Sequence, residues 1–127
     1  MDKDKNQESL DLSAEILRNI ELGEIPLSGV VAKTIRLARL AGDIESLNWL
    51  RLELSGYGSS GVSVPPNEWV HGGRSKRYYQ EKDKSGILQN YMRIESVGRI
   101  EAEIEAAKIQ LSVSKDPDVS VSSSNPN

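Results

Sequence analysis

The sequence predicts a mainly α-helical protein, a compact bundle of about four helices with a long central loop that can form a short β-hairpin. Three observations lead to this prediction. Apolar residues recur at helical spacing in the first 56 residues, a second helical stripe occupies the region after residue 91, and residues 55–90 between them hold six of the ten glycines. A length of 127 residues with 37% hydrophobic residues suits one domain.

We expect this domain to lie between two flexible ends. Residues 1–8 are predicted to be a disordered N-terminus, and residues 112–127 a flexible Ser-rich tail or linker. The single mostly helical domain is predicted over residues 9–111, with three helices in 9–56, an irregular segment in 57–90 and a final helix in 91–111.

Glycine and proline signals separate the three helices predicted within residues 9–56. Gly23 stands where the first helix would end. Pro26 suits the first turn of the second helix, because proline has no N–H and an N–H at that position would be unpaired. Gly42 closes the second helix, and Asp43 is a natural N-cap for the third. Such short connections predict a compact helical unit.

The final helix carries apolar residues spaced by three and four, as in a helix that packs along one stripe. They are Val97, Ile100, Ile104, Ala107 and Leu111. Two heptads are too few for an independent coiled coil, so we expect this stripe to dock on the first three helices. Glu101 and its neighbouring charges are expected on the solvated outer side.

The irregular segment contains most of the aromatic residues but few aliphatic ones. We predict that Tyr57 and Trp69 pack back on the helices near Trp49 and so anchor the segment. Tyr79 is expected to stay exposed. Short strands are expected in three places, around Val62–Val64, Trp69–His71 and Arg77–Tyr79.

Composition excludes several classes of site. Without cysteine, the chain has no disulfide, zinc–thiolate or iron–sulfur site and no thiol nucleophile. Its single histidine, His71, excludes a multi-histidine metal site within one chain. We therefore expect no metal, no cofactor and no catalytic residue. With no apolar run long enough to cross a membrane and a charged N-terminus, the protein is expected to be cytoplasmic, without membrane contact.

A basic and aromatic segment is the candidate for contact with nucleic acid. Residues 74–84 hold five cations against two acidic residues, although the chain has a net charge of −3. Phosphate contact beside base stacking is a common way to bind single strands. The candidate residues are Arg74, Lys76, Arg77, Tyr78 and Tyr79. A solvated hairpin or loop is the alternative interpretation.

A hydrolytic site centred on His71 and Glu53 is a third hypothesis. His71 could act as a general base near neutral pH. It lacks a serine or aspartate partner at a recognised spacing, however, so an ordinary loop histidine is the favoured interpretation.

The first half of the chain is similar to a known family. Its pattern runs through Pro26-Leu27-Ser28, Lys33 to Asp43, Trp49-Leu50 and Glu53-Leu54-Ser55-Gly56-Tyr57. It resembles the AbiTii domain, a small N-terminal module of bacterial abortive-infection (phage-defence) proteins. The motif is Trp49, Glu53, Gly56 and Tyr57 at fixed spacing, and Ser96 to Glu101 fits the family's last element. Gly58 departs from the family, which commonly has proline there.

The resemblance implies a module that sits ahead of effector or sensor domains, with no catalytic residue to transfer. We therefore expect a non-catalytic adaptor or oligomerisation module that forms a homo-oligomer and docks a protein partner or effector domain. A nucleic-acid-binding module is the alternative. Glu53 lies near a helix C-terminus, where a buried carboxylate needs a cation, and Arg36 or Arg39 is the expected partner.

Overall fold

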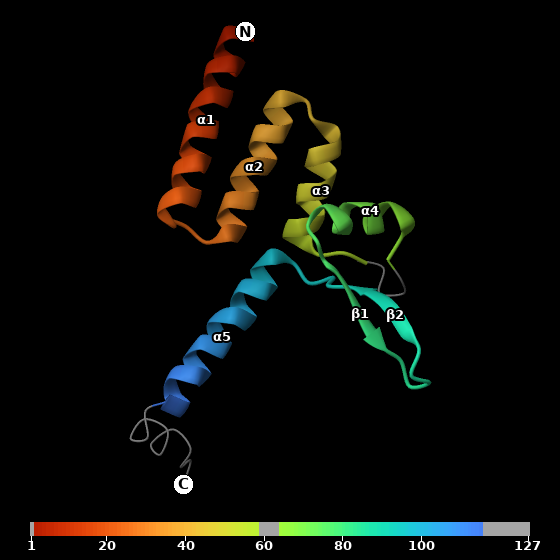
Figure 1. Cartoon of the computed structure of the whole chain (residues 1–127). Coiled ribbons are helices and arrows are strands. Elements are labelled where there is room, and N and C mark those ends of the chain that lie inside the picture. Colours follow the sequence, from red (N-terminus) through yellow and green to blue (C-terminus); the bar gives the residue numbers. More distant parts are fainter. Residues whose placement is uncertain (1, 59–63, 116–127) are drawn as a thin grey trace.

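The computed structural model describes residues 2–58 and 64–115 of the chain. It confirms a mainly helical fold with a short antiparallel hairpin (Figure 1). Two of the three residues of the predicted strand at Val62–Val64, and residues 116–127 of the predicted tail, fall outside the described residues. Residues 112–115, predicted as the start of the flexible tail, are helical instead. The elements are α1 (Asp2–Leu22), α2 (Leu27–Ala41), α3 (Ile44–Ser55), α4 (Pro66–Arg74), β1 (Tyr78–Lys82), β2 (Leu88–Met92) and α5 (Val97–Lys115).

Helices α1, α2 and α3 lie side by side, with α2 in the middle (Figure 1). The predicted end of α2 and the predicted start of α3 are confirmed. Gly42 closes α2 in the left-handed conformation at φ 69°, and the Asp43 carboxylate accepts a hydrogen bond from the Ser46 N–H at 3.0 Å. The sequence predicts residues 1–8 to be disordered, but helix α1 begins at Asp2, so residues 2–8 are helical.

The hydrophobic core lies between α2 and α3. Its buried residues are Val31, Ile35, Ala38, Leu47, Leu50 and Val97, with Trp49 packed against them. Val97 is the first residue of α5 and the only buried residue of that helix, all of which is described. The core is thus formed by apolar residues of α2 and α3 and closed at one end by α5.

The central segment contains a helix that the sequence analysis missed. The strand predicted around Trp69–His71 is wrong, because these residues belong to α4. Pro65 at the N-cap and Pro66 at the first helical position favour a helix start, since neither needs an N–H partner there. The strand predicted at Arg77–Tyr79 is confirmed as β1, which pairs with β2 in the register Tyr78↔Met92.

Two adjacent glycines allow the hairpin to pack against α4. A Cβ at Gly72 would lie 2.0 Å from the Met92 Sδ atom, and a Cβ at Gly73 would lie 2.8 Å from the Tyr78 hydroxyl oxygen. Met92 is buried by this contact. The Gly72-Gly73 pair therefore has a packing role.

Replacing Gly72 with alanine is expected to destabilise the fold by about 1–3 kcal/mol, because the new methyl group overlaps a buried side chain. Gly98→Ala in α5 is the matched control, since the nearest atom to its new Cβ would be 4.0 Å away. There the helix preference of alanine is expected to stabilise the chain by about 0.5–1 kcal/mol. Urea unfolding of both variants measures the difference, and a stabilised Gly72→Ala would contradict the packing argument.

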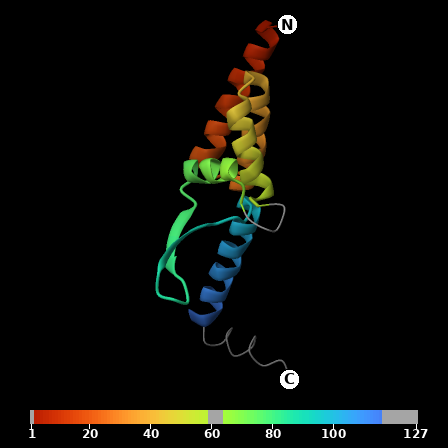
Figure 2. The same cartoon turned by 90° about the vertical axis from the view of Figure 1, so that its right-hand side faces the viewer.

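Helix α5 begins beside the start of α2 and the end of α3, and extends away from them in the direction opposite to the N-terminus (Figures 1 and 2). Two predictions about it are wrong. The helix begins at Val97 rather than near residue 91, because residues 88–92 form β2. Its apolar stripe does not dock along its length, since Ile104 and Leu111 are 51% and 56% exposed.

Glu101 is not simply a solvated residue of α5. Its Oε1 atom accepts a hydrogen bond from the Ser28 N–H at 2.7 Å. Ser28 lies in the first turn of α2, where free N–H groups and the positive end of the helix dipole favour a carboxylate. Glu101 therefore fixes the first turns of α5 to the start of α2.

Candidate functional site

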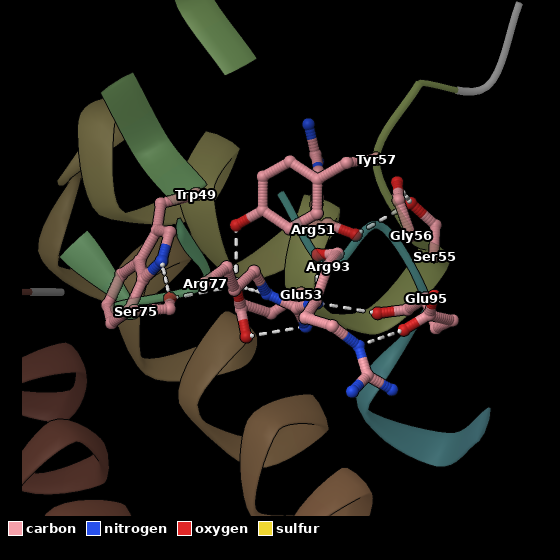
Figure 3. Close-up of polar contacts among 10 residues, drawn as sticks. All are labelled: Trp49, Arg51, Glu53, Ser55, Gly56, Tyr57, Ser75, Arg77, Arg93 and Glu95. Atoms are coloured by element: carbon pink, nitrogen blue, oxygen red, sulfur yellow. Dashed lines mark hydrogen bonds and ion pairs between the residues drawn. The ribbon is translucent and has the colours of Figure 1, made fainter. Parts of the chain in front are cut away.

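The motif residues of the sequence meet in one buried polar cluster at the end of α3 (Figure 3). Glu53 is only 7% exposed, yet it carries a carboxylate. Its Oε2 atom accepts hydrogen bonds from the Tyr57 hydroxyl at 2.5 Å, the Ser75 hydroxyl at 2.8 Å and Arg77 Nε at 2.8 Å. Its Oε1 atom accepts from Arg77 Nη2 at 3.1 Å. The carboxylate is thus enclosed by donors.

Arg77 is the cation that Glu53 requires. The two side chains form a bidentate pair in which the Arg77 side chain is 6% exposed. The remaining nitrogen, Nη1, donates to the carbonyl oxygens of Arg93 at 2.7 Å and Glu95 at 2.8 Å. One guanidinium group therefore joins α3 to the segment between β2 and α5.

This arrangement corrects the predicted partners of Glu53. Arg36 and Arg39 are wrong as partners: Arg36 pairs with Glu8 on the surface instead. Arg77, which the sequence analysis names as a possible nucleic-acid contact, has a buried side chain, and all three of its nitrogens donate within the protein. Glu53 and Arg77 are 24 positions apart in the sequence, so the spacing of neighbouring residues could not predict that they form an ion pair.

The end of α4 places Arg77 in this position. Lys76 has a positive φ of 54°, and the N–H groups of Lys76 and Arg77 donate to the carbonyls of Gly73 and Gly72 at 3.1 Å each. This pair of bonds with a left-handed residue is a Schellman ending. It reverses the chain direction and turns the following side chain, Arg77, toward α3.

Gly56 and Tyr57 connect the end of α3 to the same segment. The Tyr57 N–H donates to the Ile94 carbonyl at 2.8 Å. A Cβ on Gly56 would lie 3.1 Å from that same oxygen, and Gly56 has a φ of +98° that other residues rarely adopt. Tyr57 is 3% exposed, which confirms that it packs back on the helices.

Trp49 extends the cluster outward. Its indole N–H donates to the Ser75 hydroxyl oxygen at 2.7 Å, and the Arg74 guanidinium lies 4.4 Å from the centre of its ring. Trp49, Ser75 and Glu53 therefore form a chain of hydrogen bonds (Figure 3). Ser75 is a member that sequence reasoning missed, since a lone serine after a helix carries no distinctive signal.

The cluster shifts the pKa values of its two acids in opposite directions. Burial alone would raise the pKa of Glu53, but hydrogen bonds from Arg77, Tyr57 and Ser75 outweigh it and hold the pKa below its ordinary value of 4.5. Burial and the neighbouring Glu53 carboxylate raise the pKa of Tyr57. At neutral pH the site is therefore an ionised carboxylate beside a neutral phenol.

The lowered pKa of Glu53 predicts a loss of stability in acid. The stabilisation is fully present above 4.5 and is lost as the pH falls through the folded-state pKa, because the unfolded chain then binds more protons. Glu53→Gln should flatten this part of the stability curve. Urea midpoints measured from neutral pH to about pH 3 test this, with Glu105→Gln on the exposed part of α5 as the control. Equal acid slopes in wild type and Glu53→Gln would contradict the prediction.

Of the other residues in the basic and aromatic segment, some contact the rest of the protein and some are exposed to solvent. Tyr78 donates its hydroxyl hydrogen to the Trp69 carbonyl, and the two rings lie 5.4 Å apart. Tyr79 is 42% exposed, as predicted, and stacks on Tyr91 at 5.5 Å. An open hollow of about 510 Å³ beside them is lined by Lys76, Arg77, Tyr78, Tyr79, Arg93 and Glu95.

Trp69 is only partly buried. Its ring packs against Tyr78 of the hairpin. Tyr57 is thus the more deeply buried of the two aromatic residues expected to anchor the segment.

Among the described residues, His71 and Glu53 are not joined by a hydrogen bond. His71 lies on α4, and its Nδ1 atom is buried with no hydrogen-bond partner among the described residues. The four donors on Glu53 come from Tyr57, Ser75 and Arg77, so the two residues of that hypothesis share no bond. Within residues 2–58 and 64–115, no group of three or more possible ligands is placed to hold a metal ion.

None of the described helices combines the length and apolar character needed to cross a membrane. Searches of the curated proteins and of the solved structures found no match to the chain. The AbiTii family model, by contrast, matches residues 11–125, which includes every residue of the buried cluster. The chain therefore belongs to the AbiTii family, a membership that associates it with abortive infection, the bacterial defence against phage.

Proposed function

We propose that the chain is a non-catalytic module that joins copies of a phage-defence protein to one another and positions a partner or effector domain. The observation that supports this function best is the surface of α5. Three large aliphatic side chains of this helix, Ile104, Ile109 and Leu111, are 51–58% exposed. Side chains of this kind gain free energy when a partner covers them.

The buried cluster supports the non-catalytic part of the proposal. A general base needs a free lone pair that a substrate can reach. The Glu53 carboxylate instead accepts four hydrogen bonds from its own chain and is buried. We assign the family motif a structural role: it fixes the hairpin and the start of α5 to the three-helix unit.

Sedimentation velocity over a wide concentration range tests the proposal. The chain is expected to form a discrete oligomer at high concentration. A chain that stays monomeric over the whole range, with no co-purifying partner, would contradict the proposal.

Binding of single-stranded nucleic acid is the second candidate, supported by the stacked and partly exposed Tyr79–Tyr91 pair beside Lys76. Fluorescence anisotropy with short oligonucleotides tests it, because each phosphate contact adds roughly 0.7 to the slope of log affinity against log salt. Lys76→Ala should lower this slope, while Lys5→Ala on α1 should not. No binding at low salt would eliminate this function.

A further inference from the structure

Beyond its first turns, α5 lacks the support that helices of its length usually have. Val97 is buried in the core and Glu101 bonds to α2, but residues 102–112 are all exposed. Isolated helices shorter than about 12–15 residues are marginal in water. A partner surface would therefore add stability to the outer part of α5.

The stripe formed by Ile104, Ala107 and Leu111 is the face to be covered. These residues continue, at spacings of three and four, the line on which Val97 packs into the core. Ile109 is exposed as well, but at about 100° per residue it lies on the far side of the helix from Ile104. Leu27, which precedes the residue that bonds to Glu101, is also 56% exposed.

Charge is distributed unevenly along α5. The first half, residues 97–105, contains Arg99 and three glutamates, which gives a net charge of −2. The second half, residues 106–115, contains Lys108 and Lys115 and has a net charge of +2. Two copies of α5 side by side and antiparallel would bring unlike halves together, whereas a parallel pair would bring like halves together.

We propose that α5 pairs with α5 of a second copy as an antiparallel two-helix seam along Ile104, Ala107 and Leu111. This inference rests on the proposed function and names its surface. In the usual antiparallel arrangement of such stripes, Ile104 faces Ala107 of the second copy and Leu111 faces Ile100. Lys108 then lies beside Glu101 of the second copy, whose Oε2 atom has no hydrogen bond among the described residues.

Two matched substitutions test which face of α5 is covered. Ile104→Glu places a charge in the seam and is expected to weaken dimerisation at least tenfold. Ile109→Glu makes the same change at an equally exposed isoleucine on the far side, and is expected to leave the dissociation constant within about twofold. Sedimentation equilibrium gives the constants, and circular dichroism checks that both variants are folded.

Cysteine cross-linking tests the direction of pairing, since the chain contains no cysteine of its own. A mixture of Ile100→Cys and Leu111→Cys chains is expected to give a mixed disulfide that mass spectrometry identifies. Leu111→Cys alone should not cross-link, because the two copies of residue 111 lie far apart in an antiparallel pair.

The outcomes separate this inference from the proposed function. A chain that is monomeric at all concentrations overturns both. Self-association that resists Ile104→Glu, depends on Ile109, or lets Leu111→Cys cross-link with itself overturns the seam and leaves the oligomerisation module in place. Loss of the dimer in Ile104→Glu alone, with the mixed disulfide, supports the seam.

Discussion

Replacing Arg77 with methionine is expected to lower the free energy of unfolding by about 3–5 kcal/mol. Methionine fills much of the same space but leaves the Glu53 carboxylate buried without its cation. It also removes the donors to the Arg93 and Glu95 carbonyls. Domains of this size are stable by roughly 5–15 kcal/mol, so the variant should lose a large share of its free energy of unfolding.

Urea unfolding followed by circular dichroism measures this loss. Arg36→Met is the matched control, because Arg36 also pairs with a glutamate but has a side chain that is 64% exposed. An exposed pair contributes about 0–1 kcal/mol. If the two variants lose similar amounts of stability, the Glu53–Arg77 pair is not the link that fixes the hairpin to α3.

A double variant distinguishes the stability lost with the ion pair from the stability lost by burying an unpaired carboxylate. Glu53→Gln combined with Arg77→Met removes both charges, so it should recover part of the stability lost in Arg77→Met alone. A double variant less stable than the single one would mean that the Glu53 carboxylate is stabilised by Tyr57 and Ser75 without Arg77.

The three-helix unit could be predicted from the sequence because its signals are local. Gly42 and Asp43 act within one or two turns of chain, and they end α2 and begin α3 as expected. The burial of Tyr57 followed from the position of an aromatic residue directly after a glycine helix end. Gly42 and Asp43 bond to residues three positions away, and the Tyr57 hydroxyl group bonds to Glu53, four positions away.

Several of the errors concern contacts between distant parts of the chain. Arg77 could not be chosen over Arg36 or Arg39 from spacing, because the Schellman turn at Lys76 decides where its side chain points. The packing role of Gly72-Gly73 depends on Met92 and Tyr78, which come from the hairpin and are not neighbours in the sequence. The stripe of α5 was correctly identified as apolar, but periodicity does not say whether a surface is covered by the same chain.

Tyr57→Ala is the second substitution for which we expect a large effect, a loss of about 3–5 kcal/mol. Tyr57 is 3% exposed, its ring lies 4.9 Å below the Arg77 guanidinium, and its hydroxyl group bonds to Glu53. Truncation therefore removes buried area and a donor to the carboxylate together. Tyr79→Ala is the matched control, since the same change at a 42% exposed ring should cost less than about 1 kcal/mol.

Tyr57→Phe divides this effect between the ring and the hydroxyl group. Phenylalanine keeps the buried ring but removes one donor to Glu53, which is expected to cost about 1–3 kcal/mol. Because the pKa of Tyr57 is raised, the neutral hydroxyl group stabilises the folded state. This stabilisation is fully present below the ordinary tyrosine pKa of 10 and is lost as the pH rises through the folded-state pKa. The alkaline loss of stability should be smaller in Tyr57→Phe. If Tyr57→Phe and Tyr57→Ala lose equal stability, the hydroxyl bond to Glu53, rather than ring packing, holds the end of α3 in place.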